Sequence, residues 1–223
     1  MRIQLPVSLV VSIACLTACG KSATPGADTT ATAASTTSST TTIPSNPSAA
    51  PTSNDDKIKN AESAAPDSIA RMATVMDWPA TEGGKPTQLR AGTNGWVCYP
   101  STPNPSRVVG EDPMCLDPQF QKWAEAYMSK GTPKLSGIGV GYMLAGDRGA
   151  SISDPFADPG KKPKDWVTAG PHIMVAAPNS STLSSLPGKP NGGVPWVMWK
   201  GTPYAHIMVP TTAPDMGKPA TGR

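Results

Sequence analysis

The sequence predicts an α+β domain in which a mainly antiparallel sheet is packed by one or two helices. Three observations favour this fold class: an amphipathic helical segment over 117–131, a strictly alternating segment over 135–144, and several short apolar segments separated by Gly and Pro. Residues 56–210 are long enough for one domain with its own core. The formal net charge of +3 is mild and no basic run carries interleaved aromatics, so nucleic-acid binding is not expected.

Residues 1–18 have the pattern of a signal peptide, with one Arg near the start and an apolar run that is too short to remain as a spanning helix. The segment ends in Leu-Thr-Ala-Cys at 16–19, which resembles the lipobox of bacterial lipoproteins. The resemblance implies that Cys19 becomes the lipid-modified N-terminus, with acyl chains such as palmitate holding the protein on a membrane. An ordinary secretory signal with a chance cysteine is the alternative.

The residue after the modified cysteine bears on location. Lipoproteins kept at the inner membrane tend to carry Asp there, and this chain carries Gly20, so the outer membrane facing the periplasm is favoured. The following residues up to 55 are almost all Thr, Ser, Ala, Pro and Asn, which predicts a disordered linker behind Cys19. Residues 211–223 are expected to form a disordered tail.

Cys98 and Cys115 are predicted to form a structural disulfide. Cys15 and Cys19 lie outside the folded part, and export makes a disulfide the expected state of the remaining pair. The bond would close a Pro-rich ring over 100–113, and a ring of that size is worth about 3 kcal/mol. The alternative, a metal-thiolate or redox pair, lacks both Cys-x-x-Cys spacing and a nearby His.

The elements before this ring are predicted from local signals. Residues 56–73 read as a helix that is broken or restarted at Pro66, and a short strand is expected over 74–78. The apolar stripe of that helix consists of Ile69, Met72 and Ala73. Asn94-Gly95 is a strong turn signal, so a hairpin is expected that pairs 88–90 with 96–98.

The helix after Cys115 has the clearest signals in the chain. Asp117 is a good N-cap, Pro118 suits the first helical position, and Gly131 marks the end. Its apolar stripe consists of Phe120, Trp123, Ala124, Tyr127 and Met128. Because the helix begins two residues after Cys115, we expect the disulfide to hold its N-terminus against the sheet.

The strand predicted over 135–144 has one nearly bare face. Its glycines alternate with larger side chains, so a helix or another backbone is expected to approach that face closely. The following segment, 146–165, carries Asp147, Asp154 and Asp158 and is expected to be a solvated loop, because the spacing does not match a calcium loop. The C-terminal part predicts strands over 166–177, 194–200 and 204–209, with a short turn or helix over 182–186.

The chain has two histidines, and each is followed by Ile-Met-Val: His172 precedes Met174 by two residues, and His206 precedes Met208 in the same way. In a strand, residues two apart share one face. If the last two strands pair across the turn at 201–203, Met198 lies opposite His206 and Trp196 lies opposite Met208.

Imidazole and thioethers are ligands that suit Cu(I). The four residues Trp196, Met198, His206 and Met208 resemble the set in small periplasmic copper(I)-binding proteins, where two Met and one His hold the ion under a Trp ring. The resemblance implies a Cu(I) site here, to which His172 and Met174 are also assigned as candidate ligands. The alternative is that Trp and Met fill the core and each His has a satisfied hydrogen bond.

Catalysis is a further alternative, with His172 or His206 as general base and Asp154, Asp158 or Lys200 nearby, which would make the protein a periplasmic hydrolase or lyase. The chain contains no Gly-x-Ser-x-Gly or Ser-x-x-Lys nucleophile motif.

Four segments of the folded part, 92–98, 112–117, 141–144 and 196–210, resemble a family of exported bacterial domains without a characterised activity. The resemblance implies one exported domain and no particular reaction. The prediction from sequence is therefore a binding or interaction module, tethered through Cys19, whose partner is a protein or a small molecule.

Overall fold

The computed structural model describes residue 51 and residues 53–81, 84–102, 111–158, 160–161 and 163–211. The predicted signal peptide, Cys19, nearly all of the predicted linker and residues 212–223 of the predicted tail lie outside the described residues. None of the helices in the described part is long and apolar enough to cross a membrane.

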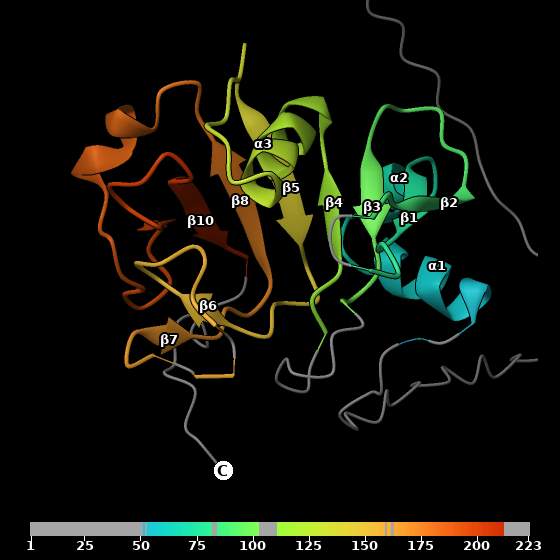
Figure 1. Cartoon of the computed structure of the whole chain (residues 1–223), viewed down its shortest axis with the longest axis horizontal. Helices are drawn as coiled ribbons and strands as arrows, with labels where there is room; N and C mark the ends of the chain where they lie inside the picture. The colour runs from blue at the N-terminus through green and yellow to red at the C-terminus, as the bar shows by residue number, and fades with distance from the viewer. Residues whose placement is uncertain are drawn as a thin grey trace, which may run out of the picture. The chain divides into compact units, whose positions relative to one another are not determined.

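The domain is built on one mixed sheet of eight strands in the order β2-β1-β3-β4-β5-β8-β10-β9 (Figure 1). The strands are β1 (Thr74–Asp77), β2 (Thr87–Arg90), β3 (Val97–Tyr99), β4 (Met114–Leu116), β5 (Gly139–Met143), β8 (His172–Ala176), β9 (Trp196–Met198) and β10 (His206–Pro210). Neighbouring strands are antiparallel except β1 and β3, which are parallel. The predicted α+β class, with a mainly antiparallel sheet and few helices, is confirmed.

Helix α3 (Pro118–Met128) lies on one face of the sheet, over β4, β5 and β8 (Figure 1). It starts as predicted, because the Asp117 carboxylate accepts hydrogen bonds from the N–H groups of Gln119 and Phe120 at 3.0 and 2.7 Å. The glycines of β5 allow the close approach: a Cβ on Gly139 would stand 2.8 Å from the backbone N of Phe120. This confirms the predicted contact with the bare face of that strand.

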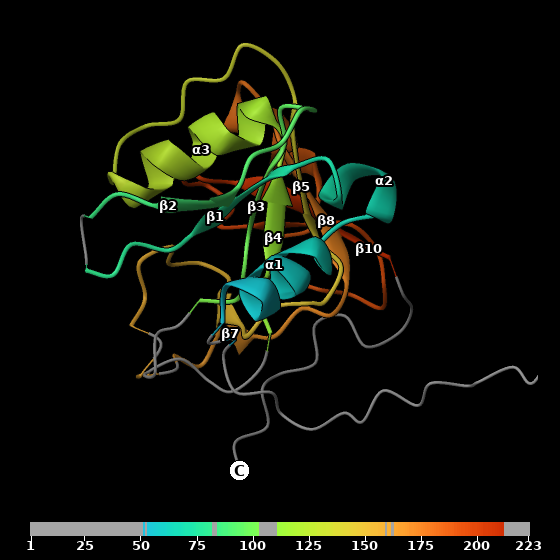
Figure 2. The same ribbon diagram turned by 90° about the vertical axis from the view of Figure 1, so that its right-hand side faces the viewer.

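Helices α1 (Asn54–Glu62) and α2 (Asp67–Ala70) cover the opposite face, and Figure 2 shows the sheet between them and α3. The interruption at Pro66 is as predicted. The buried side chains on this side are mostly alanines, because the helices lie close to the sheet. Met72, which was predicted in the apolar stripe, is 52 % exposed instead.

The predicted disulfide between Cys98 and Cys115 is present and buried on the α1 side of the sheet. The two cysteines are direct partners on β3 and β4, with their Cα atoms 4.0 Å apart. The next residue of β4, Leu116, points to the α3 side and packs in the other core cluster. The disulfide therefore ties β3 to the strand that leads directly into α3.

The predicted hairpin between 88–90 and 96–98 is wrong, because β1 lies between β2 and β3 in the sheet. The Asn94-Gly95 turn does form, with Gly95 at φ +78° and the Trp96 N–H donating to the Asn94 side chain. The chain around Gly92 instead meets the end of α2, where the Thr93 N–H donates to the Met72 carbonyl at 2.8 Å. With the chain around Gly92 held there, β1 and not β2 pairs with the edge of β3.

The segment predicted as a solvated loop over 146–165 contains β6 (Ala150–Ser151), which pairs with β7 (Trp166–Val167) in a small second sheet. Residues 166–177 form two strands, β7 and β8, where one was expected. The short helix predicted at 182–186 is the 3-10 turn Ser180–Ser185, which covers the β9–β10 face away from α3.

Candidate functional site

The C-terminal strands have the register that the sequence predicts. His206 of β10 is the direct partner of Met198 on β9, and Met208 is the direct partner of Trp196. On the other side of β10, Met208 is the partner of Met174 on β8. These side chains are buried on the sheet face that α3 covers. His172 is two residues before Met174 and is fully buried on the same face.

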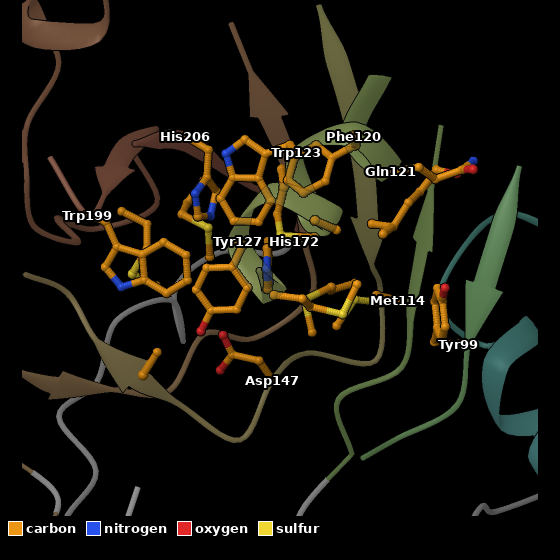
Figure 3. Close-up of a pocket in the computed structure, with 18 of the residues that line it drawn as sticks. Tyr99, Met114, Phe120, Gln121, Trp123, Tyr127, Asp147, His172, Trp199 and His206 are labelled. Atoms are coloured by element: carbon orange, nitrogen blue, oxygen red, sulfur yellow. The ribbon is translucent and has the colours of Figure 1, made fainter. Parts of the chain in front are cut away.

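A cavity of about 400 Å³ lies between this face and α3. Both histidines line it. Its sulfur-bearing lining residues are Met114, Met128, Met143, Met174, Met198 and Met208, and its aromatic ones are Trp78, Tyr99, Phe120, Trp123, Tyr127 and Trp199. Figure 3 shows the aromatic side chains of α3 above the strands that carry the histidines. The cavity reaches the surface beside Met128, which is 53 % exposed, and Glu125.

Both imidazole rings are held in the same way. Nδ1 of His172 lies 2.7 Å from the carbonyl oxygen of Gly170, and Nδ1 of His206 lies 3.0 Å from that of Tyr204. A carbonyl oxygen only accepts, so Nδ1 carries the proton and, in a neutral ring, the lone pair is on Nε2. Nε2 of His172 is buried and has no hydrogen-bond partner among the described residues. His172 therefore has a basic nitrogen free for a ligand.

His206 sits in a box of aromatic rings. The ring centroids of Trp123, Trp199 and Phe120 lie 5.0, 5.2 and 6.1 Å from that of the imidazole, each at a steep interplanar angle. The pKa of His206 is lowered to about 4, mainly by burial and to a smaller extent by the charge on His172, while the hydrogen bond to the Tyr204 carbonyl acts in the opposite direction. The ring is therefore neutral at physiological pH and its Nε2 is available as a ligand or hydrogen-bond acceptor.

The aromatic wall continues outward from His206. The rings of Trp123, Trp199 and Tyr127 are nearly parallel, with centroids 5.2 to 5.9 Å apart. The Tyr127 ring also stacks on Phe156 at 5.4 Å, and its hydroxyl donates to the Pro155 carbonyl at 2.8 Å. The wall thus joins α3, the strand end at 199 and the loop at 155–156.

Asp147 is an acidic residue in the lining of the cavity, close enough to His172 for their charges to interact. One oxygen of its carboxyl group accepts hydrogen bonds from the N–H groups of Gly149 and Ala169, at 2.9 and 2.8 Å. Figure 3 shows the carboxyl group directed toward the cavity, on the side of Tyr127 and His172. Burial raises the pKa of Asp147, while His172 and the two backbone hydrogen bonds act in the opposite direction. The sequence-based expectation of a solvated carboxylate is wrong for this residue.

The structure does not gather the other acids and bases named for catalysis. Asp154 and Asp158 cap their own loop turns by accepting from the N–H groups of Phe156 and Gly160. The Lys200 ammonium donates to the Leu186 carbonyl at 2.6 Å and lies outside the cavity with the histidines. The acid–base groups that line this cavity among the described residues include His172, His206 and Asp147, and none of the described lining residues is Ser, Cys or Lys.

The candidate copper ligands are only partly brought to one place. Met174, Met198 and Met208 line the cavity with the two histidines, whereas Trp196 is buried in the adjoining core and does not line it. The rings beside His206 are those of Trp199 and Trp123 instead. Within the described residues no three His, Cys, Asp or Glu side chains are grouped to hold a metal, so a metal here would depend on thioethers.

Sequence reasoning missed the contribution of α3 and Asp147. The predicted apolar stripe of α3 is buried at Phe120 and Trp123 and half-buried at Ala124 and Tyr127, whereas Met128 is 53 % exposed. The sequence carries no signal that this stripe faces the histidines. The signal for Asp147 was weak: it follows Gly146, a turn glycine at φ +86°, directly after a buried strand. Comparisons with protein-family models, curated proteins and solved structures found no match to this chain.

Proposed function

We propose that this protein is a binding module of the bacterial cell envelope and that the cavity between α3 and strands β8, β9 and β10 holds a small, mainly apolar ligand. One observation carries the proposal: a cavity of about 400 Å³ lined mainly by aromatic rings and thioethers, with two imidazole rings and the carboxyl groups of Asp147 and Glu125 among its few polar groups. Binding sites for small molecules have this size, and they combine apolar walls with a few placed polar groups.

A substitution that fills the cavity tests this proposal. Ala124 of α3 lines the cavity, and Ala126 of the same helix does not. The purified full chain in a maltoside detergent would be titrated with two neutral probes, indole and 3,3-dimethylbutan-1-ol, by calorimetry. We expect a dissociation constant of about 1 mM or lower. Ala124→Phe should abolish this binding, and Ala126→Phe should retain it. Equal binding by both variants would place the probes elsewhere on the protein.

Cu(I) is a second candidate ligand, and the strand register favours it. Direct antiparallel partners have Cβ atoms about 5 Å apart, so His206 and Met198 can reach one point. Met208 is two residues from His206 on the same face and lines the same cavity. One neutral imidazole nitrogen and two thioethers form a soft donor set that suits Cu(I) and excludes hard cations such as Mg²⁺.

A titration with Cu(I) against a competing chromophoric chelator tests the copper site. Met198→Leu and Met208→Leu remove the sulfur and keep the volume, so the fold should be retained. We expect one ion per chain, with affinity reduced at least about tenfold in each variant. Met72→Leu is the matched control, because Met72 is 52 % exposed and lies outside the cavity. If the chelator keeps all the copper in the presence of the unaltered chain, this site does not exist.

The membrane anchor is a proposal that the lipobox resemblance at 16–19 supports. In cells grown with labelled palmitate, the protein should carry the label and fractionate with the outer membrane. Cys19→Ala should lose both properties, and Cys15→Ala should lose neither. Label retained by the Cys19 variant would remove the proposed anchor.

A further inference from the structure

We propose that the ligand of this cavity is an organic cation of the quaternary ammonium class. The inference rests on the proposed function, because it names the class of ligand for the same cavity. Six aromatic side chains line the cavity together with the carboxyl groups of Asp147 and Glu125, and no Lys or Arg is among the described lining residues. The charges and quadrupoles of this lining therefore favour a positive ligand over a neutral or negative one.

The carboxylate of Asp147 supplies the negative charge on which this inference depends. No Lys, Arg or other cation forms an ion pair with it among the described residues, and its two hydrogen bonds from Gly149 and Ala169 both reach one oxygen. Neighbouring Arg148 points elsewhere, to Asp112 and to the Thr102 carbonyl. Asp147 is partly buried, and a carboxylate withdrawn from water is costly without an opposite charge. A cation bound in the cavity would supply that charge.

The walls suit methylated nitrogen in particular. Trp123, Tyr127 and Trp199 form a continuous aromatic wall, and the rings of Trp78 and Tyr99, tilted by 32° with centroids 4.7 Å apart, line the cavity from the β1 and β3 side. Quaternary ammonium groups have no N–H to donate, so they are recognised by ring faces and a nearby carboxylate. The thioethers between the walls are polarisable and pack against methyl groups without competing hydrogen bonds.

A matched pair of probes shows how much the positive charge of a ligand contributes to its affinity. Choline and 3,3-dimethylbutan-1-ol have the same shape and differ in a charged nitrogen against a neutral carbon. We would titrate both into the full chain in a maltoside detergent by calorimetry. The expected result is that choline binds about tenfold tighter than the alcohol and that Ala124→Phe removes the binding of both.

Two carboxamide variants locate the charge. Asp147→Asn keeps the oxygen that accepts from Gly149 and Ala169, so the loop should stay folded, and it should weaken choline about fivefold or more while leaving the alcohol unchanged. Asp154→Asn is the matched control, because Asp154 caps the same loop outside the cavity. Circular dichroism of each variant shows whether the fold is kept.

The outcomes separate this inference from the proposed function. If the alcohol binds as tightly as choline and Ala124→Phe removes both, the cavity binds ligands but does not select a cation, and the inference fails alone. If Asp147→Asn or Ala124→Phe leaves the affinity for choline unchanged, the cation binds at another place and the inference also fails. If neither probe nor indole binds, the proposed function fails with it.

Discussion

Acid should destabilise this domain through His206. The imidazole is buried to 3 % exposure, and burial holds its pKa at about 4 against an ordinary value of 6.5. Below pH 6.5 the unfolded chain takes up a proton at this position and the folded chain does not. The free energy of unfolding therefore falls as the pH drops from 6.5 toward 4, and this contribution is constant below that value.

The size of the effect follows from the same two values. The difference between 6.5 and about 4 corresponds to a loss of about 3 kcal/mol between pH 7 and pH 4. A loss of that size is a large part of the stability of a typical domain. Asp147 acts in the opposite direction, since its raised pKa makes the folded chain bind its proton more readily, and Asp165, whose pKa is lowered by hydrogen bonds from Ser153 and Ser151, acts in the same direction as His206.

The variant His206→Asn separates the contribution of His206 to the pH dependence of stability from those of the carboxylates. His206→Asn keeps an N–H near the position of Nδ1 for the Tyr204 carbonyl and removes the titrating group. Urea unfolding of both proteins at several values between pH 7 and pH 4 gives the difference in free energy, in which the carboxylate contributions cancel. We expect the unaltered chain to lose about 3 kcal/mol more than the variant. Parallel pH profiles, or an NMR titration of the ring near 6.5, would refute the assignment.

Three further predictions concern stability and are checked by urea or thermal unfolding. Replacing Cys98 and Cys115 together by Ala should cost about 3 kcal/mol, because the disulfide spans 17 residues; an unchanged midpoint would contradict the loop-entropy argument. Gly139→Ala should cost about 1–3 kcal/mol by pushing α3 off β5, while Gly137→Ala, whose Cβ meets nothing within 4 Å, should cost under about 0.5 kcal/mol; equal effects would refute the close approach. Asp117→Ala should cost about 1 kcal/mol, and Asp117→Asn should recover most of it if capping is the cause.

The sequence by itself determined the parts of the fold that depend on neighbours along the chain. Asp117, Pro118 and the spacing of the apolar residues specify the start and buried face of α3, since capping and helical periodicity act within a few residues. The alternation of His206 and Met208 around a short turn likewise fixed which side chains meet Met198 and Trp196, because a hairpin sets its own register.

Only the tertiary structure decided how distant segments meet. The Asn94-Gly95 turn forms, yet β1 from earlier in the chain takes the place beside β3 that the turn alone would give to β2. Turn residues specify a local bend, and the pairing depends on contacts across the whole sheet. The candidate site has the same origin: helix α3 carries Trp123 and Tyr127 over strands that begin more than forty residues later, and Asp147 reaches them from a third segment. Such juxtapositions follow from the packing of α3 on the bare face of β5. The two candidate histidines could therefore be identified from the sequence, whereas the aromatic cavity around them could not.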